Sequence, residues 1–283
     1  MSEQRAGRRR GVGLVGSATA ARVFRCAVAG ILGLSPACTP AGSRNGAESP
    51  APPQGTFATP VVLAAAGESP VGYGLTGVNK PNGAVYRFRE SVPPTTPDYV
   101  QRQRAGLDLK IADPTDDGWL AFYKGPLPDA PRNAAYRAVL YGPGGGERWE
   151  LDLNRLLSAE SHLEIQDIRY QDGQLYFNEA CQSYAREAGG ECSALVRVDA
   201  ASGAVVWRTH DLVSNNIFLL HGPYVVAGYG FTNEPDALHL VSRDSGRTLD
   251  TLPLASAHSY LEFRDGKLYV LTYDGALTVT IEE

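Results

Sequence analysis

The sequence lacks long hydrophobic runs and long segments with the apolar spacing of an α-helix. Its main N-terminal apolar run, Cys26 to Leu34, has nine residues, whereas a membrane-spanning helix needs about twenty. From residue 57 onward, short apolar runs alternate with turn residues, and the 31 Gly and 19 Pro suit many turns. These features predict an all-β domain over residues 57–283.

Basic charge is scarce in the main part of the chain. Residues 1–37 hold six of the 26 Lys and Arg but only one of the 31 Asp and Glu, so the rest has 20 basic and 30 acidic residues. The formal net charge therefore falls from −5 for the whole chain to −10 after residue 37. Nucleic acids and anionic membrane surfaces bind clustered Lys and Arg, so we expect no nucleic-acid partner.

The sequence signatures of catalysis and cofactor binding are also missing. There is no Gly-x-Ser-x-Gly or His-Glu-x-x-His motif, and the five His show no close pairing with Cys. Two matches to Gly-x-Gly-x-x-Gly, at residues 11–16 and 72–77, lack the preceding strand and following helix that dinucleotide binding requires. The sequence thus predicts no catalytic residue, metal or cofactor.

Residues 1–37 have the layout of a signal peptide. Six Arg and the apolar run precede the small residues Ser35-Pro36-Ala37, so we expect the chain to be exported. Leu34 to Cys38 resembles a bacterial lipoprotein box, in which the Cys receives the lipid, although Leu34 stands four residues before Cys38 instead of three.

Residues 38–56 are rich in Pro, Gly, Ser and Ala and predict a flexible tether. A tether directly after Cys38 favours a lipidated protein in the periplasm or at the outer membrane, touching the membrane only through its lipid. Ser35 and Ala37 equally suit ordinary cleavage, so simple secretion is the alternative.

The remaining cysteines predict a disulfide. Cys26 would leave with the signal peptide and Cys38 would carry the lipid, which leaves Cys181 and Cys192. These two flank a polar insert between predicted strands, and exported proteins fold under oxidising conditions. Two separate buried thiols are the alternative.

The predicted strands group into repeated units. Tight turns at 116–118, 171–173, 221–223 and 264–266 are each followed by a strand, and all but the last of these strands by a longer link and a hairpin. The glycines of successive turns are 55, 49 and 44 residues apart, close to the roughly 40 to 50 residues of a propeller blade. We expect a β-propeller of about five four-stranded antiparallel blades, with a β-sandwich as the alternative. The first unit lacks its first strand and the last unit its fourth, so the sequence leaves ring closure open.

One hairpin carries a family pattern. Asp199, Ser202, Gly203 and Trp207 match Asp-x-x-Thr/Ser-Gly-x-x-x-Trp, which resembles the repeat of the quinoprotein-type (PQQ-like) β-propellers. The resemblance implies a propeller, and a large aromatic on the outer strand can pack between neighbouring blades.

The resemblance has limits. Two similar hairpins have Arg87 and Asp250 where the Trp is expected. Quinoprotein dehydrogenases hold their cofactor with adjacent half-cystines, whereas Cys181 and Cys192 are eleven residues apart. The resemblance therefore carries the fold and not the dehydrogenase activity.

In such blades the tight turns lie at one end of the strands and the longer links at the other. Function is commonly carried by variable loops on a rigid scaffold. Five side chains on these links are candidate binding residues: Tyr184, Arg186, Tyr229, Phe231 and Glu234. They predict a non-catalytic binding or assembly module that meets an envelope protein or polymer. The alternative is a propeller hydrolase or lyase that uses channel-facing carboxylates, with Asp108 and Glu164 as candidates.

The lipid prediction is tested by metabolic labelling with palmitate. We expect the wild-type chain to be labelled and the Cys38→Ala variant to be unlabelled, because only the sulfur of Cys38 would receive the lipid. A wild type as unlabelled as the variant contradicts the prediction.

Overall fold

The computed structural model describes residues 62–70, 91–127, 130–159, 162–231 and 233–282. The chain divides into two units, residues 1–54 and 55–283, and every described residue belongs to the second. The predicted signal peptide, the tether and Cys38 therefore lie outside the described residues.

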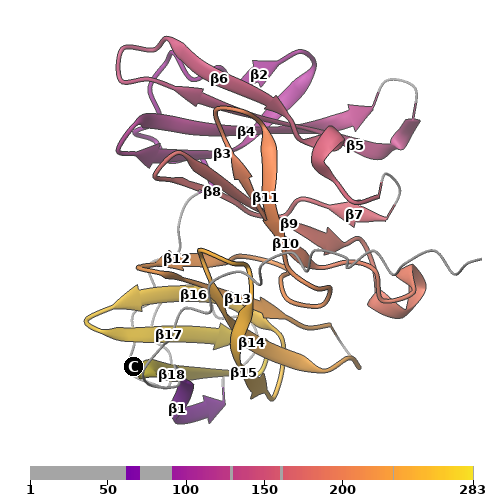
Figure 1. The fold of residues 1–283 in the computed structure, drawn as a ribbon, viewed down its shortest axis with the longest axis vertical. Helices are drawn as coiled ribbons and strands as arrows, with labels where there is room; N and C mark the ends of the chain where they lie inside the picture. The colour runs from indigo at the N-terminus through magenta and orange to yellow at the C-terminus, as the bar shows by residue number, and fades with distance from the viewer. Residues whose placement is uncertain (1–61, 71–90, 128–129, 160–161, 232, 283) are drawn as a thin grey trace, which may run out of the picture. The chain divides into compact units, whose positions relative to one another are not determined.

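The described residues form four antiparallel sheets, arranged as blades of a β-propeller (Figure 1). Blade 1 consists of β2 (Gln103–Arg104), β3 (Leu107–Thr115), β4 (Gly118–Leu127), β5 (Ala130–Tyr141) and β6 (Glu147–Asp152). Blade 2 consists of β7 (Leu163–Glu164), β8 (Ile168–Gln171), β9 (Gln174–Cys181), β10 (Ala194–Asp199) and β11 (Ala204–Arg208). Blade 3 consists of β12 (Leu219–His221), β13 (Tyr224–Tyr229), β14 (Asp236–Ser242) and β15 (Thr248–Leu254). Blade 4 consists of β16 (His258–Arg264), β17 (Lys267–Thr272), β18 (Gly275–Glu282) and β1 (Val62–Pro70).

The propeller prediction is confirmed, and the β-sandwich alternative is wrong. Each of the four predicted tight turns joins two consecutive strands of one blade: β3 to β4, β8 to β9, β12 to β13, and β16 to β17. The only helical segments in the described part of the chain are two short 3-10 turns, η1 (Leu153–Leu156) and η2 (Ala185–Ala188). The described residues provide four blades, and the hairpin predicted at residues 74–86 lies outside them.

Blade 4 receives its fourth strand from the beginning of the domain. β1 pairs antiparallel with β18, from Val62 opposite Glu282 to Pro70 opposite Gly275. Strands at the two ends of the domain thus share one sheet. This pairing supplies the strand that the last repeat lacks, which the local sequence of that repeat does not reveal.

The hairpin of the family pattern forms as expected between β10 and β11. Gly203 has φ +70° and donates its N–H to Asp199 O at 2.8 Å, while Ser202 N donates to Asp199 Oδ1 at 2.8 Å. Trp207 is 9% exposed and packs with core residues of blades 2 and 3. Its Nε1 donates to Arg243 O of blade 3 at 3.0 Å. The tryptophan therefore joins two blades, in agreement with the resemblance.

Apolar clusters fill the spaces between consecutive blades. One cluster joins blades 1 and 2 through residues such as Phe122 and Phe177, and another joins blades 3 and 4 through residues such as Leu240 and Val270. Burying one such side chain contributes about 1.5 to 3 kcal/mol to folding. These clusters fix the strands on which the loops are mounted.

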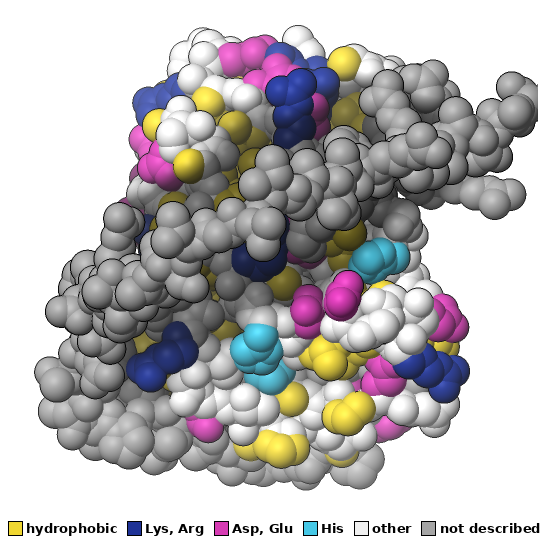
Figure 2. Space-filling model, turned by 45° about the vertical axis from the view of Figure 1, so that its right-hand side comes forward, with side chains coloured by type: hydrophobic (Ala, Val, Ile, Leu, Met, Phe, Trp, Pro, Cys, Tyr) yellow, Lys and Arg dark blue, Asp and Glu magenta, His cyan; other side chains and the backbone are white. Residues whose placement is uncertain are grey.

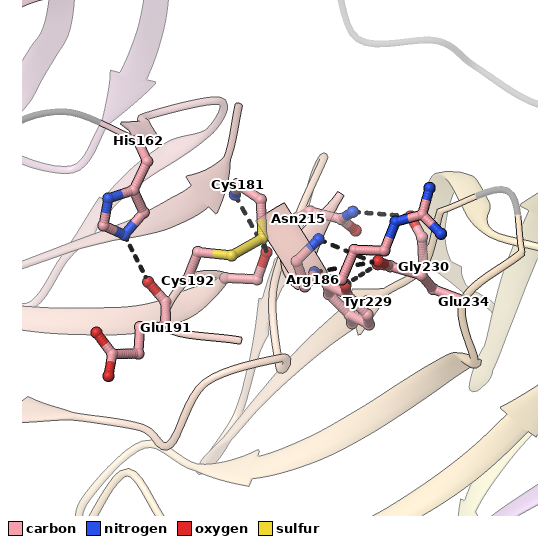
Figure 3. Close-up of a disulfide and its surroundings, with 11 residues drawn as sticks. His162, Cys181, Arg186, Glu191, Cys192, Asn215, Tyr229, Gly230 and Glu234 are labelled. Atoms are coloured by element: carbon pink, nitrogen blue, oxygen red, sulfur yellow. Dashed lines mark hydrogen bonds between the residues drawn. A yellow bond between two sulfur atoms is a disulfide. The ribbon is translucent and has the colours of Figure 1, made fainter. Parts of the chain in front are cut away.

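The predicted disulfide is present between Cys181, the last residue of β9, and Cys192 (Figure 3). Both cysteines are buried, and their Cα atoms are 5.1 Å apart. The bond closes the β9–β10 link, which contains η2.

Removing this cross-link with Cys181→Ala and Cys192→Ala together should lower the free energy of unfolding by about 2 to 3 kcal/mol, because the unfolded chain regains the entropy of a short open loop. Urea unfolding of the wild type and the double variant measures the difference. As a direct check, alkylation of the unfolded, unreduced protein followed by peptide mass spectrometry should find neither cysteine modified. Modification of both would contradict the bond.

Candidate binding site at the long-link end of blades 2 to 4

The five predicted binding residues come together in the structure. Tyr184 and Arg186 lie in the β9–β10 link, whereas Tyr229 ends β13 and Phe231 and Glu234 follow it. The ring centroid of Phe231 is 5.9 Å from that of Tyr184 and 6.1 Å from that of Tyr229. The Arg186 guanidinium lies 5.0 Å from the centroid of the Tyr184 ring. Two links that are distant in sequence thus pack against each other.

Tyr229 is not an exposed contact residue, which corrects its predicted role. It is 4% exposed, packs beside the disulfide, and donates its hydroxyl to the Glu234 carboxylate (Figure 3). Burial and this hydrogen bond raise the pKa of Tyr229 above its ordinary value. Truncating Tyr229 would therefore damage the fold of the loops, not only a binding surface.

Glu234 also acts within the structure. Its carboxylate accepts hydrogen bonds from the backbone N–H groups of Ala185 at 3.4 Å and Arg186 at 3.5 Å. It fastens the β13–β14 link to the β9–β10 link. Of the five predicted residues, the exposed Arg186 and the half-buried Tyr184 are the better placed to meet a partner.

A pocket of about 370 Å³ lies at the same end of blades 2 to 4. Its walls are formed by the segments that connect β7 to β8, β11 to β12, β13 to β14, β15 to β16, and β17 to β18, together with the first residue of β14. The lining residues that carry polar or aromatic groups are Gln166, Asn215, Asn216, Phe231, Asn233, Asp236, Ser256, Tyr273 and Asp274. Only Phe231 among these was predicted from the sequence. The run of polar residues Ser214-Asn215-Asn216, between two predicted strands, is the sequence signal that would have indicated this wall.

The orientation of the Asn215 amide is set by two backbone carbonyls. Asn215 N donates to Gly228 O at 2.8 Å, and Asn215 Nδ2 donates to Gly230 O at 2.8 Å (Figure 3). Since a carbonyl only accepts, Nδ2 must face Gly230 and Oδ1 must face away from it. Asn215 is 2% exposed, and its Oδ1 receives no hydrogen bond from a described residue. A buried acceptor left in this state costs about 1 to 3 kcal/mol.

Asp236 is the second such group. Its Oδ1 is buried without a hydrogen-bond donor among the described residues, and it lies so close to Gly230 that a Cβ on Gly230 would overlap it. Burial, together with the charges of Asp274 and Glu234, raises the pKa of Asp236 above the ordinary value of an aspartate. Gly230 is thus the residue that lets this carboxylate sit at the wall of the pocket.

Two half-buried amides of the wall, those of Gln166 and Asn216, form hydrogen bonds within the protein. Gln166 Oε1 accepts from Asn216 N at 2.6 Å, and Asn216 Nδ2 donates to His258 O at 3.1 Å. Among the remaining groups of the wall, Asn215 Oδ1 and Asp236 Oδ1 are the buried atoms with no hydrogen-bond partner in the described chain, and the Asp274 carboxylate lines the same pocket.

A second hollow, of about 360 Å³, is lined by blades 1 and 2 and by β12 of blade 3, and most of its charged side chains are paired. Arg169 bridges Asp113 at 3.4 Å and Asp167 at 2.7 Å. Asp117 accepts hydrogen bonds from Arg148 at 2.7 Å and from the Tyr170 hydroxyl at 2.9 Å. These pairs neutralise the Asp113 and Asp117 carboxylates, although Thr115 Oγ1 in the same lining has no partner among the described residues. The long-link pocket differs in that both of its carboxylates lack an ion pair there, so it is the better candidate for a charged ligand.

The two carboxylates of the hydrolase or lyase alternative interact with separate lysines. Asp108, in β3, accepts hydrogen bonds from Gln103 at 3.1 Å and Lys110 at 3.2 Å, which hold the pKa of Asp108 below its usual range. Glu164, in β7, accepts from Lys124. A general acid would instead need a raised pKa, so the environment of Asp108 does not favour catalysis.

Neither a metal centre nor a membrane span is found in the described part of the chain. It contains no group of three or more His, Cys, Asp and Glu side chains placed to hold a metal ion, and none of its helices is long and apolar enough to cross a bilayer. On the described surface shown in Figure 2, acidic and basic side chains are mixed without a broad basic patch.

The raised pKa of Asp236 predicts how the free energy of unfolding depends on pH. The folded state holds the proton of this carboxyl more tightly than the unfolded state, so ionisation at pH 7 destabilises the fold and acidification through the raised pKa removes that cost. Asp236→Asn should therefore be more stable than the wild type at pH 7, by less than about 1 kcal/mol because the carboxyl is partly open to water. The difference should shrink toward pH 4.

Urea unfolding at both pH values measures this effect, with Asp265→Asn as the control. Asp265 is an exposed acid in the β16–β17 turn, with a side chain 84% exposed. A less stable Asp236→Asn protein at pH 7 would mean that the carboxylate has a stabilising partner.

Comparison with known proteins gives distant structural likenesses. No family matches the chain, and no curated protein does. A chain of a mitotic checkpoint complex matches with a TM-score of 0.36 and 11% identity, over 53% of this chain and 47% of that one. BamB from Moraxella catarrhalis matches with a TM-score of 0.29 and 12% identity, over 60% and 71%. A europium-containing methanol dehydrogenase matches with a TM-score of 0.31 and 11% identity, over 52% and 27%. The chain thus spans about half the length of the first of these, and likenesses at this level assign neither a family nor a function.

Proposed function

We propose that this protein is an exported, lipid-anchored propeller that serves as a non-catalytic binding module at the cell envelope. Its long-link end meets a protein or an envelope polymer. Export and the anchor follow from the layout of residues 1–56. The observation that carries the binding role is the pocket at the long-link end, where buried acceptors have no donor among the described residues.

The surroundings of this pocket support the proposal. The β9–β10 link is closed by the disulfide and tied to the β13–β14 link by Glu234, so the rim is built from loops that are held in place. Preorganised loops lose less conformational entropy on binding than free ones. The hydrolase or lyase alternative gains no comparable support, because Asp108 and Glu164 are each paired with a lysine.

The proposal is tested by site-directed crosslinking in cells of a species that carries the gene. A photo-reactive amino acid at position 186 should form a discrete adduct with an envelope component, because Arg186 is exposed at the long-link end. The same group at position 267, exposed at the tight-turn end, should form none. Tyr184→Ala should then weaken binding of the purified partner by about fivefold or more, since a well-placed interface aromatic is worth over about 1 kcal/mol.

Complementation of a gene deletion distinguishes the binding module from the hydrolase or lyase alternative. The double variant Asp108→Asn, Glu164→Gln should complement the deletion as well as the wild-type gene does. A folded protein that fails only with these acid substitutions would replace the binding module by the hydrolase or lyase. Adducts from position 267 but not from position 186 would place the binding surface at the tight-turn end and contradict the proposal.

A further inference from the structure

We propose that the pocket at the long-link end binds an organic cation, namely the ammonium or guanidinium group of a Lys or Arg side chain presented by the partner. The inference rests on the proposed function, since it names the chemistry by which this end of the domain would recognise a polypeptide. Three features of the wall carry it: its charge, its acceptors and its aromatic rim.

The charge of the wall is negative and uncompensated. Asp236 and Asp274 line the pocket, whereas no Lys, Arg or His does. Neither carboxylate forms an ion pair with a described residue, although twelve other Asp and Glu side chains of the described chain do. A ligand with a positive charge would supply the missing partner.

The two buried acceptors of the wall favour a ligand that carries several hydrogen-bond donors. Asn215 Oδ1 cannot turn toward Gly230 O, and Asp236 Oδ1 is packed against Gly230, so both positions are fixed. An ammonium offers three N–H donors and a guanidinium five, with no acceptor that would oppose these oxygens. A neutral sugar hydroxyl can also donate to these oxygens, but it leaves the charge of the two carboxylates without a counter-charge.

Aromatic side chains border the same space. Tyr273 is 62% exposed, and its backbone N donates to Ala257 O at 2.9 Å, which holds the β17–β18 turn against the β15–β16 link. Phe231 lies on the β13–β14 side. Aromatic faces attract Lys and Arg side chains, and such contacts are stronger when water is partly excluded.

The size of the pocket favours a side chain over a metal ion. About 370 Å³ is within the range of ligand sites and far exceeds the space of one ion. Calcium takes six to eight oxygen ligands, whereas the wall has only two carboxylates, and no group of three or more His, Cys, Asp and Glu in the described chain is placed to hold a metal ion.

The test is calorimetric titration of the full chain with an end-blocked tetralysine peptide. The control peptide has the same sequence with every ε-amine acetylated, so length and backbone are kept while the charge is removed. We expect the tetralysine peptide to bind at least tenfold more tightly than the acetylated one. Asp236→Asn should weaken its binding at least tenfold, whereas Asp265→Asn, which removes the same charge at the tight-turn end, should leave it unchanged.

Three outcomes would overturn the inference. Equal binding of both peptides would mean that charge is not recognised, and equal losses in the two variants would mean that the peptide senses only net charge. Displacement of the tetralysine peptide by one equivalent of calcium, lost in Asp236→Asn, would make the pocket a metal site.

The crosslinking experiment tests the proposed function independently of the cation inference. An adduct at position 186 with no tetralysine binding would overturn the cation inference alone. Binding of the peptide that depends on Asp236, with no adduct at position 186, would support the chemistry of the pocket and overturn the proposed binding role.

Discussion

The buried amide of Asn178 is the constraint on which the long-link end depends. Asn178 Oδ1 accepts hydrogen bonds from the backbone N–H groups of Gln166 at 3.0 Å and Asp167 at 2.9 Å, and its Nδ2 donates to Asn216 O at 2.7 Å. Asp167 continues the network by accepting from Phe218 N at 3.1 Å. One side chain in β9 therefore fixes the broken inner strand of blade 2 and the link that leads into blade 3. Because these groups are buried, losing one partner would leave the others without a donor or acceptor.

That network explains how a pocket can have a defined wall although it is built from links. Asn216 is tied to blade 2 through Asn178 and Gln166, and to blade 4 through His258 O. Asn215, its neighbour, is tied to blade 3 through the carbonyls of Gly228 and Gly230. Two consecutive residues thus contact three blades. The acceptor of Asn215 is held in place by its bonds to Gly228 and Gly230, and its neighbour Asn216 connects this position to blades 2 and 4.

Much of the fold follows from local sequence signals, whereas most of the pocket does not. The tight turns, the hairpin at Gly203, the packing of Trp207 and the disulfide depend on residues close together in the chain or on a repeated pattern. The strand that completes blade 4 comes from more than 200 residues away, as Val62 pairs with Glu282, so the last repeat carries no local sign of it. Asn215 and Asp274 belong to different links and Asp236 begins β14, and only the packing of blades brings the three together. The burial of Tyr229 was missed for the same reason, since the β9–β10 link that covers it is distant in sequence.

The distribution of unsatisfied polar atoms argues that this pocket is more than a packing defect. A buried acid elsewhere in blade 2, Glu179, is fully satisfied by Arg208 at 2.8 and 2.9 Å and by Ser158 N and Oγ at 2.9 and 2.8 Å. In the described chain, six buried side-chain atoms have no hydrogen-bond partner, and four of them belong to Ser214, Asn215, Asp236 and His258. Those four residues lie at the long-link end of blades 3 and 4 or in the link that enters blade 3. Buried polar atoms without partners destabilise a fold, and proteins commonly keep them where a ligand or partner supplies the missing hydrogen bond. Glu179 thus has a full set of hydrogen-bond partners, whereas Asp236 Oδ1, at the wall of the pocket, has none in the described chain. This contrast supports a role for Asp236 in binding a ligand.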